Sequence, residues 1–331
     1  MKTQILLANG ENISKCGEMI RAGEIVAFPT ETVYGLGANA FDALATDKIF
    51  KAKGRPATNP LIIHVSDKSQ IGQVAEVDSL SEMLIEALMP GALTLVLPKK
   101  DVVPSIVTAG NDTVAVRMPD HPVALSLIKE AGVPVCAPSA NTSSRPSPTT
   151  ADHVYDDLCG KIPVILDGGK CPFGLESTII NMTETPPRVL RAGSVDIAEV
   201  EQIIGSVNKS SVMTDQLSEL KKPMHFVPQA ELVFSAYYEG MSVTINSYFD
   251  RMTMAGRRPI IFCMNSNAGK YDDRAVMSMG DTVKAYAGSL FEKIREVEKN
   301  HDLIIAEGVP LGGIGTTLLT RLMKLSNGNV I

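Results

Sequence analysis

Two polar segments near the start of the chain combine residue types that could handle an anionic ligand. The first reads FPTETVYGLG from Phe28 to Gly37 and follows an apolar stretch that begins at Glu24. It joins threonine hydroxyls and a carboxylate to glycines, which we expect to let the backbone approach a ligand closely. The second reads KAKGRP from Lys51 to Pro56 and continues to Asn59. Its lysines alone would equally suit a solvated helix end, but a proline fixes the loop after Arg55, which holds the guanidinium ready for phosphate or carboxylate.

A histidine and an arginine occur inside apolar segments that look like strands. In the segment LIIHV, alternation places His64 on the face of Ile62, opposite its other apolar neighbours. In the segment TVAVRM, Thr113 and Arg117 are four residues apart, so they share a face and can reach one ligand. From the residues alone, His64 fits a satisfied core histidine, and a buried Arg117 requires either an ion pair or a substrate anion.

Apolar strands alternate with amphipathic helices along the first two hundred residues, which predicts a layered α/β domain. The expected helices are residues 12–22, 43–52, 80–88 and 122–131. The expected strands are residues 25–28, 61–65, 93–97, 113–118, 133–137, 164–167 and 178–181. A second α/β unit is predicted from strands at 259–264 and 303–306 and a helix at 282–298. Between them, residues 207–229 are rich in Ser, Lys, Asp and Pro, which is typical of a linker.

The composition agrees with a soluble enzyme of two domains. A length of 331 residues is large for one core. The net charge of −6 argues against a dominant nucleic-acid surface, so any RNA contact would be local and weak. The apolar stretch within the first ten residues is too short for a signal peptide, and no apolar segment has the length of a membrane span. We therefore expect a cytoplasmic protein. Five widely spaced cysteines fit reduced thiols better than disulfides or a zinc site.

Five blocks of sequence resemble a known family. They read PTETVYGLG, KGRPxxNPLIIHV, DTVAVRMP, APSAN and FGxESTI, in this order, within residues 10–205. These blocks resemble the threonylcarbamoyl-AMP synthase family, whose core is called the YrdC-like domain. The segment LIIAEGVP from Leu303 is similar, more loosely, to the C-terminal domain of the longer members. The resemblance implies an α/β fold with a YrdC-like twisted mixed sheet and helices at 1–207, a linker at 208–229, and a smaller Rossmann-like α/β domain at 230–331.

The resemblance also implies an activity. Members of this family are nucleotidyltransferases that join L-threonine, bicarbonate or CO2, and ATP with Mg2+ into threonylcarbamoyl-AMP and pyrophosphate. The product passes to the transferase machinery that makes threonylcarbamoyladenosine in tRNA. The chain has neither a Walker loop nor a dinucleotide-binding glycine motif after a strand, so it would hold ATP by other means.

The resemblance assigns residues to both substrates. The positions that match threonine ligands of the family are Thr32, His64, Arg117, Ala137 and Ser177. The positions that match ATP ligands are Lys53, Arg55, Asn59, Thr113, Ser139, Asn141, Ser147 and Arg191. Lys53 and Arg55 would stabilise the triphosphate charge. No general base follows from the sequence; His64 is a possible one, but it fits equally well as a residue that only orients the substrate. For Arg191 an ordinary surface arginine stays open.

The sequence differs from the family in the linker. Longer members carry PGMKYxHYAP there, whereas this chain reads KKPMHFVP from Lys221 to Pro228. A tyrosine that would reach the nucleotide is replaced by Phe226, which puts closure of the linker over ATP in doubt.

Two other classes of function remain open from the sequence. The chain could be an RNA-binding YrdC-like module without synthase activity, although its acidity weighs against this. It could also be a related carbamoyl-transferring enzyme, but the type found in hydrogenase maturation would bring zinc-finger cysteine pairs that this chain lacks.

Overall fold

The computed structural model describes residues 2–143, 145–209 and 228–331. It divides into two compact units, one comprising Met1–Ser143 with Ser147–Met213, and the other comprising Ser144–Pro146 with Thr214–Ile331. Phe226, whose replacement of a tyrosine puts linker closure over ATP in doubt, lies outside the described residues. Among the described helices, none is both long and apolar enough to cross a membrane.

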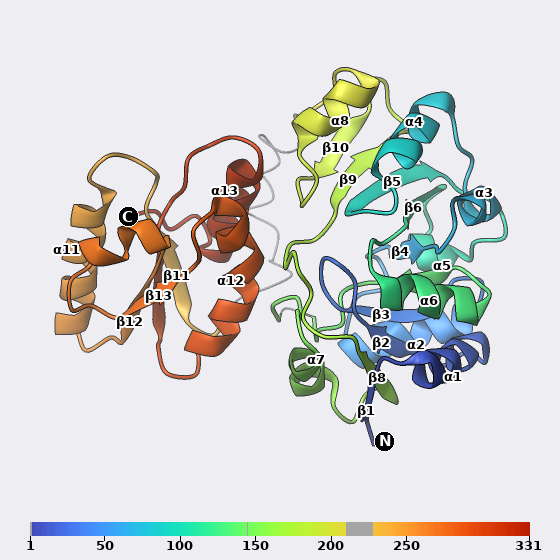
Figure 1. Cartoon of the computed structure of the whole chain (residues 1–331), viewed down its shortest axis with the longest axis horizontal. Coiled ribbons are helices and arrows are strands. Elements are labelled where there is room, and N and C mark those ends of the chain that lie inside the picture. Colours follow the sequence, from blue (N-terminus) through green and yellow to red (C-terminus); the bar gives the residue numbers. More distant parts are fainter. Residues whose placement is uncertain (1, 144, 210–227) are drawn as a thin grey trace. The chain divides into compact units, whose positions relative to one another are not determined.

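The first unit is built on a mixed ten-stranded sheet (Figure 1). Its order is β1-β8-β2-β3-β7-β4-β6-β5-β9-β10, so strands distant in sequence become neighbours. The strands are β1 Gln4–Leu7, β2 Val26–Phe28, β3 Gly35–Asn39, β4 Ile62–His64, β5 Leu93–Pro98, β6 Thr113–Arg117, β7 Val135–Ala137, β8 Val164–Asp167, β9 Thr178–Asn181 and β10 Arg188–Arg191.

Most helices of this unit begin at a residue whose side chain caps the first turn. Asp42 accepts hydrogen bonds from the first turn of α2, which ends at Gly54 in the left-handed region with φ of 61°. The helices are α1 Gly10–Arg21, α2 Ala43–Lys53, α3 Ile71–Val74, α4 Ser79–Leu88, α5 Ser105–Thr108, α6 Pro122–Ala131, α7 Ala151–Leu158 and α8 Ile197–Ile204, with a 3-10 turn at Lys68–Gln70.

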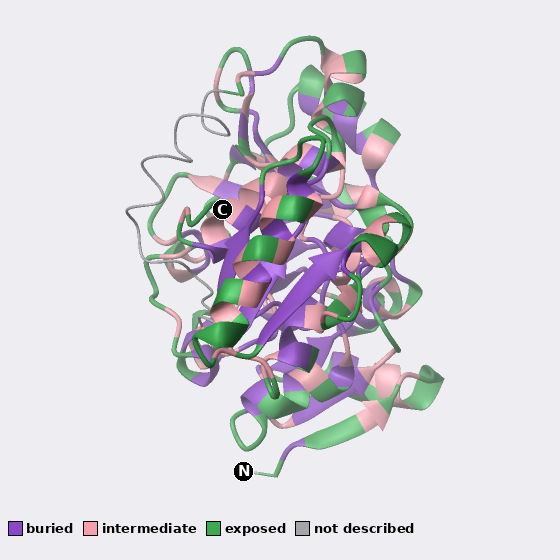
Figure 2. Cartoon of the chain, turned by 90° about the vertical axis from the view of Figure 1, so that its left-hand side faces the viewer, coloured by how far each residue is buried: buried purple, intermediate pink, exposed green. Residues whose placement is uncertain are grey.

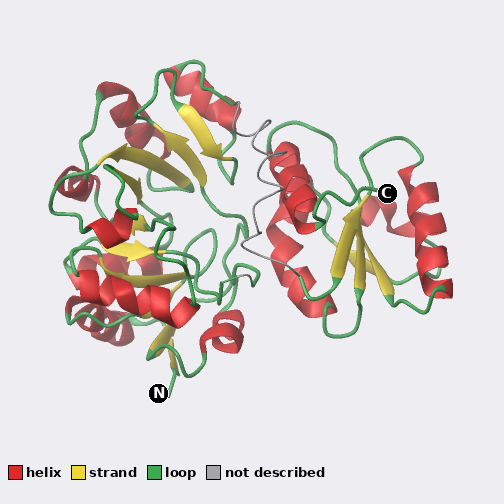
Figure 3. Cartoon of the chain, turned by 180° about the vertical axis from the view of Figure 1, so that it is seen from behind, coloured by secondary structure: helices red, strands yellow, loops and turns green. Residues whose placement is uncertain are grey.

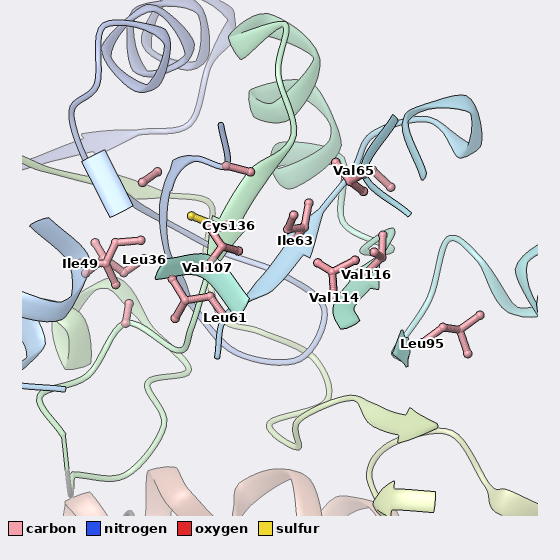
Figure 4. Close-up of a cluster of buried hydrophobic side chains, with 14 of the residues drawn as sticks. Leu36, Ile49, Leu61, Ile63, Val65, Leu95, Val107, Val114, Val116 and Cys136 are labelled. Carbon is pink, nitrogen blue, oxygen red and sulfur yellow. The ribbon is translucent and has the colours of Figure 1, made fainter. Parts of the chain in front are cut away.

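Two apolar clusters lie on the two faces of this sheet. One packs α1 and α6 against β2, β7 and β8, and includes Ile20, Phe28 and Leu127. The larger one packs α2 and other helices on the opposite face. In Figure 4, Ile63 of β4 lies beside Val114 and Val116 of β6 within that larger cluster. Burial of apolar side chains on both faces fixes the strand register, and therefore fixes which side chains point away from the cores.

Most predicted elements are present, with ends shifted by one or two residues. The strands at 164–167 and 178–181 and the helix at 122–131 are confirmed as predicted. In the first unit, the structure adds β1, β3 and β10 and four short helices that the periodicity did not reveal.

The prediction that Gly35 and Gly37 let the backbone approach a ligand is wrong. Both lie within β3, and a Cβ atom on Gly37 would come within 2.8 Å of the Phe28 ring and 2.7 Å of Val135. These glycines make room for the neighbouring side chains of the sheet instead.

The second unit has a parallel sheet in the order β11-β14-β12-β13, flanked by helices on both faces (Figures 1 and 3). Its elements are β11 Glu231–Phe234, α11 Met241–Met254, β12 Pro259–Cys263, a 3-10 turn at Asn265–Lys270, β13 Val276–Ser278, α12 Val283–Val297, β14 Leu303–Ala306 and α13 Ile314–Leu325. β12 and β14 are buried throughout, whereas α11 buries only one side (Figure 2). This arrangement confirms the predicted smaller α/β unit.

Candidate active site

Three of the predicted threonine ligands lie where neighbouring strands of the first sheet begin or end; this row of strand ends is called the threonine edge below. β4 and β6 run parallel with His64 opposite Arg117, so both residues stand at the carboxyl ends of neighbouring strands. β5 runs antiparallel to β6, and its first residue, Leu93, pairs with Thr178 at the start of β9. Ser177, just before β9, therefore belongs to the same edge. Topology brings together residues that are distant in sequence.

Arg117 is the centre of this edge and is only 4% exposed. Its Nη1 donates a hydrogen bond to Thr32 Oγ1 at 3.0 Å, and its Nε donates to the Gly91 carbonyl at 3.3 Å. Its Nη2 lies 2.5 Å from Glu31 Oε1 in an ion pair. The guanidinium is thus held in one orientation, and the predicted neighbours Thr32 and Arg117 are in direct contact.

His64 is buried on the opposite side of the sheet from the larger apolar cluster. Its Nδ1 lies 3.1 Å from the Ile62 carbonyl, and its ring meets Phe28 edge-on. Burial, followed by the nearby Arg117 charge, lowers the pKa of His64 to about 3. The imidazole is therefore neutral and weakly basic near pH 7, which favours an orienting role over that of a general base. Its predicted strand face is confirmed.

Ser177 and Arg191, predicted to bind different substrates, contact each other. Arg191 Nε donates to the Ser177 carbonyl at 2.9 Å, and its Nη2 donates to Ser177 Oγ at 3.0 Å. Ser177 Oγ also lies 2.7 Å from Thr94 Oγ1. Arg191 is accordingly anchored toward the site and is not a freely solvated surface arginine.

Lys53 connects the basic segment to the loop after β7. The side chain is buried, and its Nζ donates to the Ser139 carbonyl at 2.5 Å and to the Asn141 carbonyl. Burial, followed by repulsion from Arg55, lowers the pKa of Lys53 to about 7. The ammonium therefore braces the predicted nucleotide loop, and its charge depends on pH within the physiological range.

The remaining predicted ligands fall into smaller groups. Arg55 donates to the carbonyls of Asn59 at 3.4 Å and Pro60 at 3.1 Å. Ser147 Oγ donates to Glu176 at 3.2 Å, next to Ser177. Ala137 ends β7 opposite Ile62, two residues before His64.

Thr113 lies at the other end of β6 from Arg117. Four strand residues span about 13 Å, so the two side chains share a face but not one small ligand. A single ligand that touches both must be as long as a nucleotide joined to an amino acid.

Comparison with known proteins gives the family. One family model, described as Telomere recombination, matches residues 18–193, and another, described as Threonylcarbamoyl-AMP synthase, C-terminal domain, matches residues 195–326. A threonylcarbamoyl-AMP synthase of Pyrococcus abyssi is 44% identical over 320 residues, which cover 94% of this chain and 93% of that protein. This chain belongs to the threonylcarbamoyl-AMP synthase family.

Other members of the threonylcarbamoyl-AMP synthase family agree over the full length. The Bacillus subtilis protein of that name is 41% identical over 338 residues, 99% of this chain and 97% of that protein. The crystal structure of P. abyssi Sua5 complexed with L-threonine has a TM-score of 0.91 at 41% identity and covers 100% of this chain and 99% of that one. The predicted family, its two-unit α/β fold and its synthase activity of the nucleotidyltransferase type are confirmed.

The sequence does not single out two residues of this threonylcarbamoyl-AMP synthase site. Glu31 stands between two threonines without an assigned role, yet it is 2% exposed and pairs with Arg117. Thr94 lies in an apolar strand, yet its hydroxyl contacts Ser177. The signal for Glu31 is its position beside Thr32, whereas no sequence signal distinguishes Thr94.

Proposed function

We propose that this chain makes threonylcarbamoyl-AMP and pyrophosphate from L-threonine, bicarbonate or CO2, and ATP. The observation that carries this proposal is the buried, pre-oriented guanidinium of Arg117, which contacts Thr32 and neighbours His64 at a sheet edge. A buried arginine in fixed orientation suits the carboxylate of an amino acid. Ser177, anchored by Arg191, supplies a hydroxyl at the same edge. We assign Thr32, His64, Arg117, Ala137 and Ser177 to threonine.

The proposed chemistry depends on position and charge. The amine of threonine takes up CO2 or bicarbonate to form a carbamate, and a carbamate oxygen attacks the α-phosphorus of ATP in line with departing pyrophosphate. Such transfers need alignment and neutralisation of charge more than a covalent nucleophile. The chain offers Lys53 and Arg55 for this purpose, with Ser139 and Asn141 on the loop that Lys53 braces.

Of the other proposed nucleotide ligands, two lie away from the threonine edge and two lie beside Ser177. They are Asn59, beside Arg55, Thr113 at the far end of β6, Ser147, and Arg191. The span between Thr113 and Arg117 suits a nucleotide whose α-phosphate faces the threonine pocket.

Mg2+ is proposed to arrive with the nucleotide. Among the described residues, no group of three or more His, Cys, Asp or Glu side chains is arranged to hold a metal ion. Mg2+ commonly keeps several waters and binds substrate phosphates, which is compatible with the basic and hydroxyl side chains present here. When bound, it would offset phosphate charge.

We further propose that the product serves the transferase machinery that modifies tRNA, in the cytoplasm, with at most a weak direct tRNA contact. The acidic net charge of −6 supports this limit on RNA binding.

The decisive experiment measures pyrophosphate release with ATP, Mg2+, L-threonine and bicarbonate, and then with each one omitted from degassed buffer. We expect release only with the complete set. Serine should be used less well, because one methyl group in a shaped pocket contributes roughly 1–3 kcal/mol. Equal release without bicarbonate would contradict the mechanism, and RNA binding without any release would favour the RNA-binding module.

A further inference from the structure

Arg117 has a buried carboxylate beside it, that of Glu31, which the family resemblance assigns to neither threonine nor ATP. Glu31 is 2% exposed, and its Oε1 lies 2.5 Å from Arg117 Nη2. This contact is an ion pair. Neither oxygen of Glu31 accepts a hydrogen bond from the residues that the structure describes. A buried carboxylate in this state retains strong capacity for a cationic donor.

Backbone contacts fix Glu31 at the threonine pocket. The Phe173 amide donates to the Glu31 carbonyl at 2.9 Å, and the Gly174 amide donates to the Thr32 carbonyl at 3.0 Å. The loop continues from Gly174 to Ser177, just before β9. The backbone at Glu31 and Thr32 is therefore held by the segment that leads to Ser177, another proposed threonine ligand.

The charged side chains around the threonine pocket balance one another. Burial lowers the pKa of His64 to about 3 and raises the pKa of the Cys171 thiol to about 12, so both are uncharged near pH 7. Burial also lowers the pKa of His121, although Glu31 opposes this shift. Arg117 and Glu31 contribute one positive and one negative charge, and Arg191 and Glu176 add one of each sign beside Ser177, so these four side chains carry no net charge.

We infer that Glu31 binds the ammonium group of the incoming amino acid while Arg117 binds its carboxylate. This inference rests on the proposed function and adds a recognition element to the same site. A neutral pair of opposite charges matches a zwitterion, which adds no net charge to a buried pocket. A monoanion without the ammonium would leave one uncompensated negative charge there. Glu31 therefore selects α-amino acids over the same acids without the ammonium group.

The experiment compares two ligands that differ only in the amino group. L-Threonine and (R)-3-hydroxybutanoate are titrated calorimetrically into the full chain, into Glu31→Gln and into Glu24→Gln. Glu24 is a matched control, because it is a half-exposed glutamate paired with Lys48 on the surface. Wild-type protein and Glu24→Gln should prefer threonine by tenfold or more. In Glu31→Gln, threonine affinity should fall at least tenfold, whereas that of (R)-3-hydroxybutanoate should stay constant or rise.

The outcomes separate the inference from its alternatives. If Glu31→Gln weakened both ligands by the same factor, Glu31 would only orient Arg117 and the inference would be overturned. Equal affinity of the wild-type protein for the two ligands would also overturn it, without any dependence on how the variant folds. Pyrophosphate release by the wild-type protein, measured in parallel, tests the proposed function independently. If release is threonine-dependent while the ligand preference is absent, only the ammonium assignment fails.

Discussion

Each unit of this protein buries a glutamate in a segment that follows a strand, but the two carboxylates are satisfied in different ways. In the second unit Glu307 is fully buried, its Oε2 accepts a hydrogen bond from the Met264 amide at 2.8 Å, and its Oε1 accepts one from Tyr271. In the first unit Glu31 has the charge of Arg117 nearby but accepts no hydrogen bond from the described residues.

The difference separates a structural carboxylate from one prepared for a ligand. Glu307 has donors from Met264, directly after β12, and from Tyr271, so its desolvation is compensated within the fold. Glu31 is compensated by a single charge, and that charge is also the one proposed to meet the substrate. Burial alone therefore does not identify a functional carboxylate; its unused acceptor capacity does.

The largest effect is expected from removing the cation of the first pair. Arg117→Ala should destabilise the first unit by about 3–5 kcal/mol, because it leaves Glu31 buried without a counter-charge. Arg117→Lys keeps the charge and should recover much of that stability, yet threonine use should remain weak because the planar fork is lost. Hydrogen exchange of β4 and β6 amides reports stability, and steady-state kinetics report threonine and ATP use separately. A lysine variant with normal threonine use, or with equal losses for both substrates, would contradict this division of roles.

The corresponding substitution in the second unit should lower stability but leave substrate binding unchanged. Glu307→Gln replaces charge-assisted hydrogen bonds from Tyr271 and Met264 with weaker ones, so local stability should fall by about 1.5–3 kcal/mol. Threonine affinity should stay unchanged where the variant is folded. Hydrogen exchange of β12 and β14 amides measures the first effect, and calorimetric titration measures the second. A specific loss of threonine affinity in this variant would remove the distinction between the two glutamates.

A smaller effect is expected from the tyrosines around Glu307. Tyr271→Phe removes a donor to the carboxylate and should cost about 1–3 kcal/mol, because an acceptor is left unsatisfied. Tyr286→Phe removes an O–H that lies 3.2 Å from the Glu307 carbonyl and 3.3 Å from the Phe262 carbonyl, and should cost about 1 kcal/mol. The same exchange measurements rank the two variants. The reverse order would show that the carboxylate is not the centre of this network.

The sequence predicted the positions of single residues better than their partners. Strand alternation placed His64 correctly, because it depends only on the residues adjoining it. β3 was missed, because Gly35 and Gly37 have low strand propensity and are tolerated only where Phe28 and Val135 fill the space above them. The pairing of Glu31 with Arg117 depends on the order of strands in the sheet, which local pattern does not encode. The hydrogen bonds around Glu307 could not be predicted either, because they also join segments that are distant in sequence.

The smallest expected effect is the uptake of a fraction of a proton when nucleotide binds, and it concerns Lys53. The pKa of Lys53 is lowered to about 7, so at pH 8 most molecules carry it uncharged. If nucleotide phosphates approach Lys53, their negative charge raises this pKa, and binding at pH 8 must take up a proton. Well below pH 7 the free protein already carries that proton, so uptake should vanish there.

Calorimetric titration of Mg-ATP in buffers of different ionisation enthalpy measures this uptake directly. Lys53→Met should abolish it, whereas Lys51→Met should retain it, because Lys51 is exposed and pairs with Asp47 at 2.6 Å. Comparable uptake in wild type and Lys53→Met would place the proton elsewhere. Lys53 would then resemble Glu307, a buried charge that holds the fold through the carbonyls of Ser139 and Asn141 and does not meet the nucleotide.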